Sequence, residues 1–381
     1  MPPPGGYGAP GQQPPFFPPP GGAPPPRSGG GKGLMIVLLG GGAVIVVLII
    51  AIVLVTVVFR EDKMTPSERL TAAAAQVSTA RALALKGTFS GSGDTVQGEL
   101  KVTKGGRATG QVTWDGDNVT LLTADDKVYV KAPKSYWSSK VTSSSVTIKD
   151  GDQWGKISST DLSLNVDRDL TPTAIASAMR SASNLRTTLR ESKTTVQGRD
   201  ALRIGTSTRT FFVTDSETPE LLRYETVFPR VQFDVTTYGS SAASSTISEL
   251  RSRMGELKDS FDSEARVSLI DTKKGLCTTN SSSCRVRGQF RPTLSGTGST
   301  KIDIKFKLTA GSTTGRSLGD CETSATVSSS TLTWAECRVS SSAWSSWSRS
   351  GQTRYYTQAE FRVQGATDSD VQSLQSGLDR E

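Results

Sequence analysis

Residues 118–132, NVTLLTADDKVYVKA, decide the fold class of this 381-residue chain. Apolar and polar residues alternate on both sides of the central pair Asp125-Asp126. A period of two is typical of a half-buried strand, and two such runs joined by two turn-forming residues predict a tight β-hairpin. The hairpin indicates an antiparallel sheet, because parallel strands need a long crossover connection.

The flanking sequence extends this sheet in both directions. Short alternating runs separated by Gly and Asp turns predict about nine strands between residues 64 and 265. Three helices are expected among them, and they make the region an α+β domain, an antiparallel sheet with helices on one face.

Local signals place the three helices. The first begins at the capping box Thr65-Pro66-Ser67-Glu68 and is expected to run to about Leu85. The second opens at Thr171-Pro172, and the third begins with a cap at Thr246. The third helix is expected to bury one apolar stripe, formed by Ile247, Leu250, Met254, Leu257 and Phe261.

Residues 266–366 have a different character. They are rich in Ser and Thr, show no helical pattern, and contain alternating runs such as KIDIKFKLTA at 301–310, so we expect a small all-β sandwich. Residues 267–366 carry 13 basic and 6 acidic residues, whereas residues 60–266 carry 28 basic and 26 acidic residues. A short amphipathic helix around Val371, Leu374 and Leu378 is predicted within residues 367–381.

All four cysteines lie in the predicted sandwich, at Cys277, Cys284, Cys321 and Cys337. Three disulfide pairings exist, and we favour Cys277–Cys284 with Cys321–Cys337 because each pair brackets a short hairpin-like stretch. A zinc site is the rival interpretation, but it calls for close pairs such as C-x2-C. Two disulfides indicate an oxidising compartment.

Two further segments precede the predicted domains. Residues 1–33 form a Pro/Gly-rich tail of the composition that stays disordered. Residues 34–59, LMIVLLGGGAVIVVLIIAIVLVTVVF, are an uncharged apolar run of 26 residues. About 20 apolar residues span a bilayer as a helix, so we expect an uncleaved, single-pass signal-anchor. The flanking charges are nearly balanced, and the cysteines favour a cytoplasmic tail with residues 64–381 outside the cell membrane.

The chain contains no histidine. This removes the commonest general base, the commonest metal ligand and every Ser/His or Cys/His nucleophile pair. We therefore expect a non-enzymatic protein without a cofactor or metal. The expected compartment favours the membrane and anionic wall polymers as partners, and it argues against nucleic acid.

Four motifs in residues 64–265 resemble the LppX/LprAFG lipoprotein family of actinobacteria. An Ala-rich helix runs directly into KGTFSGSG at 86–93, and the hairpin TADDKVYVKAPKSYW at 123–137 is similar to a family segment. A mid-chain helix precedes VQGRDALRIG at 196–205, and FFVTDSETPELLRYE at 211–225 is similar to a family strand pair. The likeness covers roughly half of the chain, and we recognise no relative of residues 266–366.

The resemblance implies a strongly curved antiparallel sheet closed by helices around an apolar cavity that binds lipids or lipoglycans at the cell envelope. The chain departs from the family because it has no cysteine before Cys277 that a lipid could modify. Alternation places a set of apolar side chains on one side of their strands. They either line such a cavity or fill an ordinary core, and they are Leu100, Val102, Val112, Trp114, Val128, Val130, Phe211, Val213, Leu222, Tyr224, Phe233 and Val235.

Aromatic and basic residues supply further candidates. Tyr136-Trp137 either form a lip at the cavity mouth or anchor a loop in the core, and we favour the core. Trp344 and Trp347 either stack on sugar rings or pack the sandwich. The basic excess of residues 267–366 is either a solvated surface or a site for a polyanion, and it includes Lys273, Lys274, Arg285, Arg287, Arg291, Lys301, Lys305 and Lys307.

Two functions are consistent with these features. The leading hypothesis is an extracytoplasmic, membrane-anchored binding protein for a lipid or lipid-linked glycan at the cell envelope. The alternative is a non-enzymatic interaction or scaffold module whose basic C-terminal β-domain binds cell-wall polymer or a partner protein. A continuous void inside residues 64–265 favours the first function, and a filled sheet core favours the second.

Overall fold

The computed structural model describes residues 64–381 except 91–94, 142–147, 186–188, 274–276, 278–279, 294–298, 329–330 and 353. Residues 63–381 form one compact unit. The predicted tail at 1–33 and the apolar run at 34–59 lie outside the described residues. None of the helices in the described part has the length and apolar character that a membrane crossing requires.

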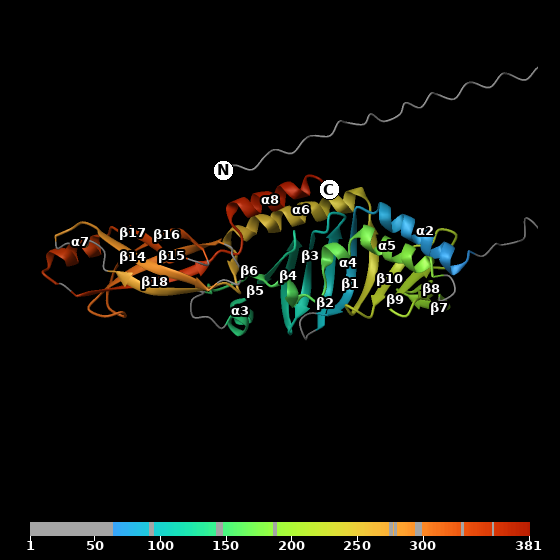
Figure 1. The fold of residues 1–381 in the computed structure, drawn as a ribbon, viewed down its shortest axis with the longest axis horizontal. Coiled ribbons are helices and arrows are strands. Elements are labelled where there is room, and N and C mark those ends of the chain that lie inside the picture. The colour runs from blue at the N-terminus through green and yellow to red at the C-terminus, as the bar shows by residue number, and fades with distance from the viewer. Residues whose placement is uncertain are drawn as a thin grey trace, which may run out of the picture. The chain divides into compact units, whose positions relative to one another are not determined.

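The largest element is a curved sheet of twelve strands (Figure 1). Neighbouring strands are antiparallel, except that β12 runs parallel to β6. In sheet order the strands are β12 (Phe261–Asp262), β6 (Gln153–Ile157), β5 (Lys127–Ala132), β4 (Asp117–Ala124), β3 (Ala108–Trp114), β2 (Thr95–Thr103), β1 (Ala82–Ser90), β11 (Val231–Tyr238), β10 (Leu221–Thr226), β9 (Arg209–Thr214), β8 (Arg199–Gly205) and β7 (Arg190–Val196).

The predicted hairpin of β4 and β5 is confirmed. Ala124 pairs with Lys127, and Asp125 and Asp126 both adopt positive φ angles of 50° and 60°. Two central residues in this region are the mark of a type I′ turn, whose twist matches that of the flanking strands. Asp tolerates the left-handed conformation because its short side chain can bond locally, so the DD pair sets the register of this hairpin.

Glycines let three adjacent strands approach closely. Gly87 on β1 pairs with Gly98 on β2, and Gly110 on β3 lies opposite Leu100. A Cβ atom added to Gly110 would lie 1.8 Å from the carbonyl oxygen of Glu99, and one added to Gly87 would lie 1.9 Å from that of Gln232. Glycine inside a strand marks a bend or a close backbone approach, so these positions accommodate the curvature of the sheet.

One face of the sheet packs against α2 (Pro66–Thr79) and α5 (Pro172–Ser183), which lie side by side (Figure 1). Their predicted N-caps are confirmed, because the hydroxyl of Thr65 accepts from Glu68 N and that of Thr171 from Ala174 N. The main core lies between these helices and the strands. Shorter elements border it: α3 (Lys134–Lys140), η1 (Ser159–Asp161) and α4 (Val166–Asp169).

The first helix is shorter than predicted. It ends at Thr79, and Ala82–Leu85 belong to β1. Ala and Leu are good helix formers, but Leu83 and Leu85 alternate with Ala82 and Ala84 and enter the main core from the strand. Pairing of β1 with β2 and β11 therefore overrides local propensity.

The prediction that the helices share one face of the sheet is wrong. A second apolar cluster joins α6 (Ser240–Glu256) and α8 (Asp368–Leu378) to the opposite face. On β4, Leu121 enters the main core, whereas its neighbour Leu122 contacts the α6 side. Successive strand residues point to opposite faces, so the consecutive apolar pair Leu121-Leu122 serves both helical layers.

The third helix also begins earlier than predicted, at Ser240 rather than near Thr246. Thr246 is buried inside α6, and its hydroxyl donates to Ala242 O. Leu250, Met254 and Leu257 of the predicted stripe face the second cluster, with Leu257 in η2 (Leu257–Asp259). Phe261 lies in β12 and enters the main core instead. The predicted C-terminal helix is present, and it buries Val371, Leu374 and Leu378.

Residues 266–366 contain two antiparallel sheets of three strands that share one apolar cluster. The strands of the first sheet are β13 (Arg266–Lys273), β14 (Cys284–Thr293) and β17 (Thr333–Val339). Those of the second sheet are β16 (Ser317–Ser328), β15 (Ser299–Ala310) and β18 (Tyr355–Val363). One helix that the sequence did not predict, α7 (Ser342–Arg349), is capped by the hydroxyl of Ser341.

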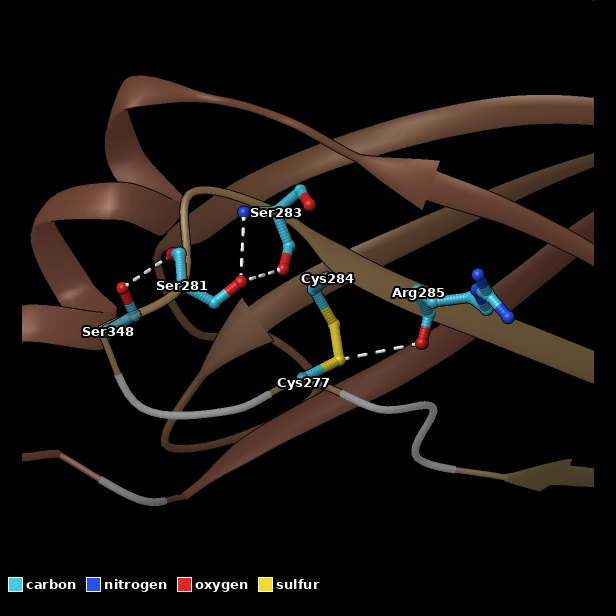
Figure 2. The surroundings of a disulfide bond; sticks show 6 residues. All are labelled: Cys277, Ser281, Ser283, Cys284, Arg285 and Ser348. Carbon is cyan, nitrogen blue, oxygen red and sulfur yellow. Dashed lines mark hydrogen bonds between the residues drawn. A yellow bond between two sulfur atoms is a disulfide. The ribbon is translucent and has the colours of Figure 1, made fainter.

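Both predicted disulfides are confirmed. Cys277 bonds to Cys284 at the start of β14 (Figure 2). Cys321 on β16 bonds to Cys337 on β17, so this bridge joins the two small sheets. The zinc interpretation is therefore wrong for these cysteines, because all four are consumed in disulfides.

Candidate ligand site

The twelve side chains predicted to line a cavity or fill a core are all buried, with exposed fractions between 0% and 6%. Eleven belong to the main core, where rings stack directly, as Phe211 does on Tyr224 with centroids 5.4 Å apart. Their low exposure indicates close packing, apart from Val128, which also lines a pocket. Their part in ligand binding stays a prediction.

The twelfth residue, Leu222, points to the other face of the sheet, where it packs with Val196, Ala201 and Phe212. A register shift between Leu221 and Arg223 disrupts the pairing of β10 with β9. An extra residue on one strand reverses the alternation beyond it. Leu221 therefore takes the core position that alternation assigned to Leu222.

The candidate tryptophans Trp137, Trp344 and Trp347 are buried. Trp137 is fully buried and donates its indole N–H to Gln153 O at 3.0 Å, which agrees with core anchoring rather than an exposed lip. Trp344 and Trp347 keep 1% and 4% of their surface exposed and pack against Tyr355. The indole rings are therefore closed to a sugar, and the prediction that they pack the sandwich is confirmed.

A pocket of about 500 Å³ opens beside the turns that join β2 to β3 and β4 to β5, next to the main core. Three segments distant in the sequence line it: residues 105–106 in the β2–β3 turn, residues 123–128 of the β4–β5 hairpin, and most of the segment 159–168. A Cβ added to Gly106 would lie 2.1 Å from a carboxylate oxygen of Asp167. The turn and the α4 segment thus meet closely at the pocket edge.

The pocket floor is apolar. Val128, Leu162, Leu164 and Val166 line it, and all four belong to the main core. The local sequence around the last three alternates apolar and polar residues, so each apolar residue faces the sheet while its neighbours face solvent. An apolar floor with few convergent polar groups is the usual composition of a small-molecule site.

Hydroxyl and carboxylate groups form the rim. Most charged groups at the rim already have partners: Asp125 contacts Arg107 at 2.7 Å, Lys127 contacts Asp370 at 2.8 Å, and Arg168 contacts Asp169. Asp126 and Asp167 form no ion pair within the described residues. The rim therefore offers free carboxylate oxygens, which accept hydrogen bonds from hydroxyl groups.

Thr123 gives the pocket an unusual polar group. Its side chain retains 7% of its surface, and its hydroxyl has no hydrogen-bond partner in the described part of the chain. Thr123 pairs across β4–β5 with Val128, which is part of the apolar floor. Buried hydroxyls are normally hydrogen-bonded, so this one can bond to a ligand atom. The ligand must first displace the atoms that cover the hydroxyl oxygen, because that oxygen exposes less than 1 Å².

Thr123 was not among the residues predicted from the sequence to line a cavity, although a signal was present. Val119, Leu121 and Thr123 occupy alternate positions of one strand, so Thr123 is a polar residue at an inward-facing position. The partners of the pocket were not recognisable, because the segment 159–168 reaches the hairpin only through tertiary packing. Within the described residues, no group of three or more Cys, Asp or Glu side chains is arranged to hold a metal ion.

Comparisons with protein-family models and with curated proteins find no match to this chain.

Proposed function

We propose that this protein is a membrane-anchored, extracytoplasmic binding protein for a lipid-linked glycan at the cell envelope. The core of the sheet is filled, so the proposal does not rest on a cavity inside it. The observation that carries the proposal is a separate pocket with an apolar floor, whose lining includes Thr123 with its unpartnered hydroxyl. A ligand that satisfies both features has an apolar part next to a hydroxylated part. The resemblance to the LppX/LprAFG lipoproteins supports the same class of ligand.

The charges at the rim favour a neutral glycan over an anionic headgroup. Asp126 and Asp167 accept hydrogen bonds but repel an anion, and Lys127 and Arg168 are engaged by Asp370 and Asp169. Sugar hydroxyls donate to carboxylates without a charge penalty. The apolar run at 34–59 supplies the proposed anchor, and a protein anchor keeps the site beside the membrane.

The experiment is native mass spectrometry of the full chain, purified in detergent from an actinobacterial host. Two variants distinguish a lipid bound in the pocket from a lipid bound to the apolar run at 34–59. Ser159→Trp places an indole at the exposed pocket rim, and Ser245→Trp makes the same change on the exposed face of α6 as a control. We expect a lipid-glycan adduct that the control retains and that Ser159→Trp and Thr123→Val both lose.

Two outcomes would contradict the proposal. One is a chain that carries no glycolipid and takes up none from added envelope extract. The other is an adduct whose abundance is the same in all four proteins, because such a lipid is held outside the pocket.

A further inference from the structure

Basic side chains in the two small sheets differ in how they are compensated. On β15, Lys305 contacts Asp320 at 2.5 Å and Glu322 at 3.2 Å, and Lys307 contacts Glu360. These lysines are neutralised by acids on the neighbouring strands β16 and β18. The sheet that contains β15 therefore does not carry the excess positive charge of this region.

The excess gathers on the outer face of the other sheet. Arg285, Arg287 and Arg291 alternate along β14 with buried residues, so all three are exposed on the same side. Arg338 on β17 lies directly opposite Arg285. We call Arg285, Arg287, Arg291 and Arg338 the arginine face. Figure 2 shows Arg285 directed away from the disulfide that begins its strand.

No member of the arginine face forms an ion pair within the described residues. Like charges directly across two strands destabilise a sheet, so the pair Arg285 and Arg338 has a cost. Two acids lie on the same face, Glu336 opposite Arg287 and Asp271 opposite Gln289, and the four arginines outnumber them. A bound anion would remove that cost. Exposed guanidinium groups that outnumber the acids around them and are grouped on one surface are the electrostatic pattern of a polyanion site.

An aromatic side chain lies within the arginine face. The guanidinium carbon of Arg287 lies 5.0 Å from the ring centroid of Trp334, and Trp334 is 39% exposed. Stacking on an indole fixes the plane of a guanidinium and reduces the entropy lost when it binds a carboxylate. The indole also offers a flat apolar edge next to the cations, which suits the C–H face of a sugar ring.

The arrangement is a row rather than a broad patch. A strand rises about 3.3 Å per residue, so the row from Arg285 to Arg291 is about 20 Å long. Glu336 on β17 lies opposite Arg287, and Asp271 on β13 lies opposite Gln289, so an acid borders the row on each side. A flat anionic membrane would bring its charge close to both acids as well as to the arginines. A single polymer strand can follow β14 and pass between Glu336 and Asp271.

From this geometry we propose that the arginine face binds a linear acidic polysaccharide, with carboxylates spaced along the polymer paired to Arg285, Arg287 and Arg291. The site is separate from the pocket at Thr123 and does not depend on its ligand. It would hold the tethered protein to an anionic glycan outside the membrane.

The test uses the full chain in nanodiscs of phosphatidylcholine and immobilised polygalacturonate, measured by interferometry at 0.15 M salt. The decisive variant is Arg285→Gln with Arg291→Gln. Its matched control is Lys305→Gln with Lys307→Gln, which removes the same formal charge from the compensated sheet. We expect at least a ten-fold weaker affinity for the first pair and less than a two-fold change for the second. All four side chains are on the surface, and unchanged melting temperatures verify the folds.

A second measurement separates a glycan from a simple polyanion. Trp334→Ala is expected to weaken binding to polygalacturonate at least three-fold and to leave binding to inorganic polyphosphate unchanged. The proposal is overturned by an absence of polygalacturonate binding, by equal losses from the arginine and lysine pairs, or by equal effects of Trp334→Ala on both polymers. Binding confined to nanodiscs or vesicles with anionic lipid would overturn it in favour of a membrane surface.

Discussion

Arg107 donates a 2.6 Å hydrogen bond to the carboxylate of Glu381, although 274 residues separate them in the chain. Both side chains are buried, with exposed fractions of 10% and 7%. Arg107 also contacts Asp125 and donates to Gly377 O in α8. The arginine thus connects the β2–β3 turn, the β4–β5 turn and the C-terminal helix on the α6 side of the sheet.

Replacement of Arg107 by Ala is expected to lower the free energy of unfolding by about 3–5 kcal/mol, because it leaves the buried Glu381 carboxylate without its partner. Chemical denaturation measures the loss, and hydrogen exchange should show the largest increase in α8. The control is Arg251→Ala, which breaks an ion pair with Asp379 whose side chains are 48% and 61% exposed. That change should cost less than about 1 kcal/mol. Equal losses from the two variants would argue against a structural role for the buried pair.

Gly155 on β6 lies against the ring of Trp137. A Cβ at this position would lie 2.5 Å from the Trp137 ring and 3.0 Å from that of Phe261. Gly155→Ala is therefore expected to overpack the core and to cost about 1–3 kcal/mol in thermal or chemical unfolding. Gly239→Ala makes the same change where no atom lies within 4 Å, and it should cost less than about 1 kcal/mol. A neutral Gly155→Ala would mean that the rings can move aside.

Asp370 in the first turn of α8 makes stability depend on pH. Burial raises the pKa of Asp370, but hydrogen bonds from Lys127 and Thr367 outweigh burial and lower it to about 2. Because the folded pKa lies below the unfolded one, the stabilisation is complete above about pH 4 and is lost as the pH falls towards 2. After allowance for solvent screening, Asp370→Asn should cost roughly 1 kcal/mol at pH 7.

Denaturation curves of wild type and Asp370→Asn, measured between pH 7 and pH 2, check this expectation. The two proteins should become equally stable near the acid end. A difference that persists unchanged at pH 2 would show that the carboxylate charge is not its cause.

Because the hydroxyl of Thr123 has no partner, its removal is expected to have opposite effects on stability and on ligand binding. Thr123→Val keeps the shape of the side chain and removes a buried polar group, so the ligand-free protein should gain about 1 kcal/mol of stability. The same variant should lose the proposed ligand. Thr123→Ser keeps the hydroxyl and should retain the ligand, although it loses a buried methyl group. A Thr123→Val protein that is destabilised without ligand would indicate that the hydroxyl already has a partner.

The disulfide between the two small sheets is expected to stabilise residues 266–366. Its cysteines are 16 residues apart, and replacing both Cys321 and Cys337 by Ala should cost about 3 kcal/mol through loop entropy in the unfolded chain. The Cys277–Cys284 bridge joins cysteines that are 7 residues apart, so it closes a shorter loop and should contribute less to the free energy of unfolding. Nonreducing peptide mapping of protein from native membranes checks both pairings. Four free thiols would contradict the pairings and the proposed outward orientation.

Local sequence determined the features that neighbouring residues decide. The turn at Asp125-Asp126 follows from residues that tolerate positive φ, and the caps at Thr65 and Thr171 follow from side chains that reach backbone N–H groups three residues on. The disulfide pairings could be chosen because each joins cysteines close in the chain. The turn and the caps depend on atoms within one turn. The Cys321–Cys337 bridge instead joins two sheets, and its pairing was predicted only from the short separation of its cysteines in the chain.

Tertiary structure decided what depends on pairing between distant segments. Strand pairing took Ala82–Leu85 from the first helix, and a single register shift turned Leu222 away from the core. Three other features depend on contacts between parts of the chain that are distant in the sequence. They are the position of α6 on the opposite face of the sheet, the contact of Thr123 with the segment 159–168 at the pocket, and the ion pairs that Lys305 forms and Arg285 does not. Sequence periodicity indicates that one face of a strand or helix is apolar or charged. Which other element packs against that face is decided by the tertiary structure.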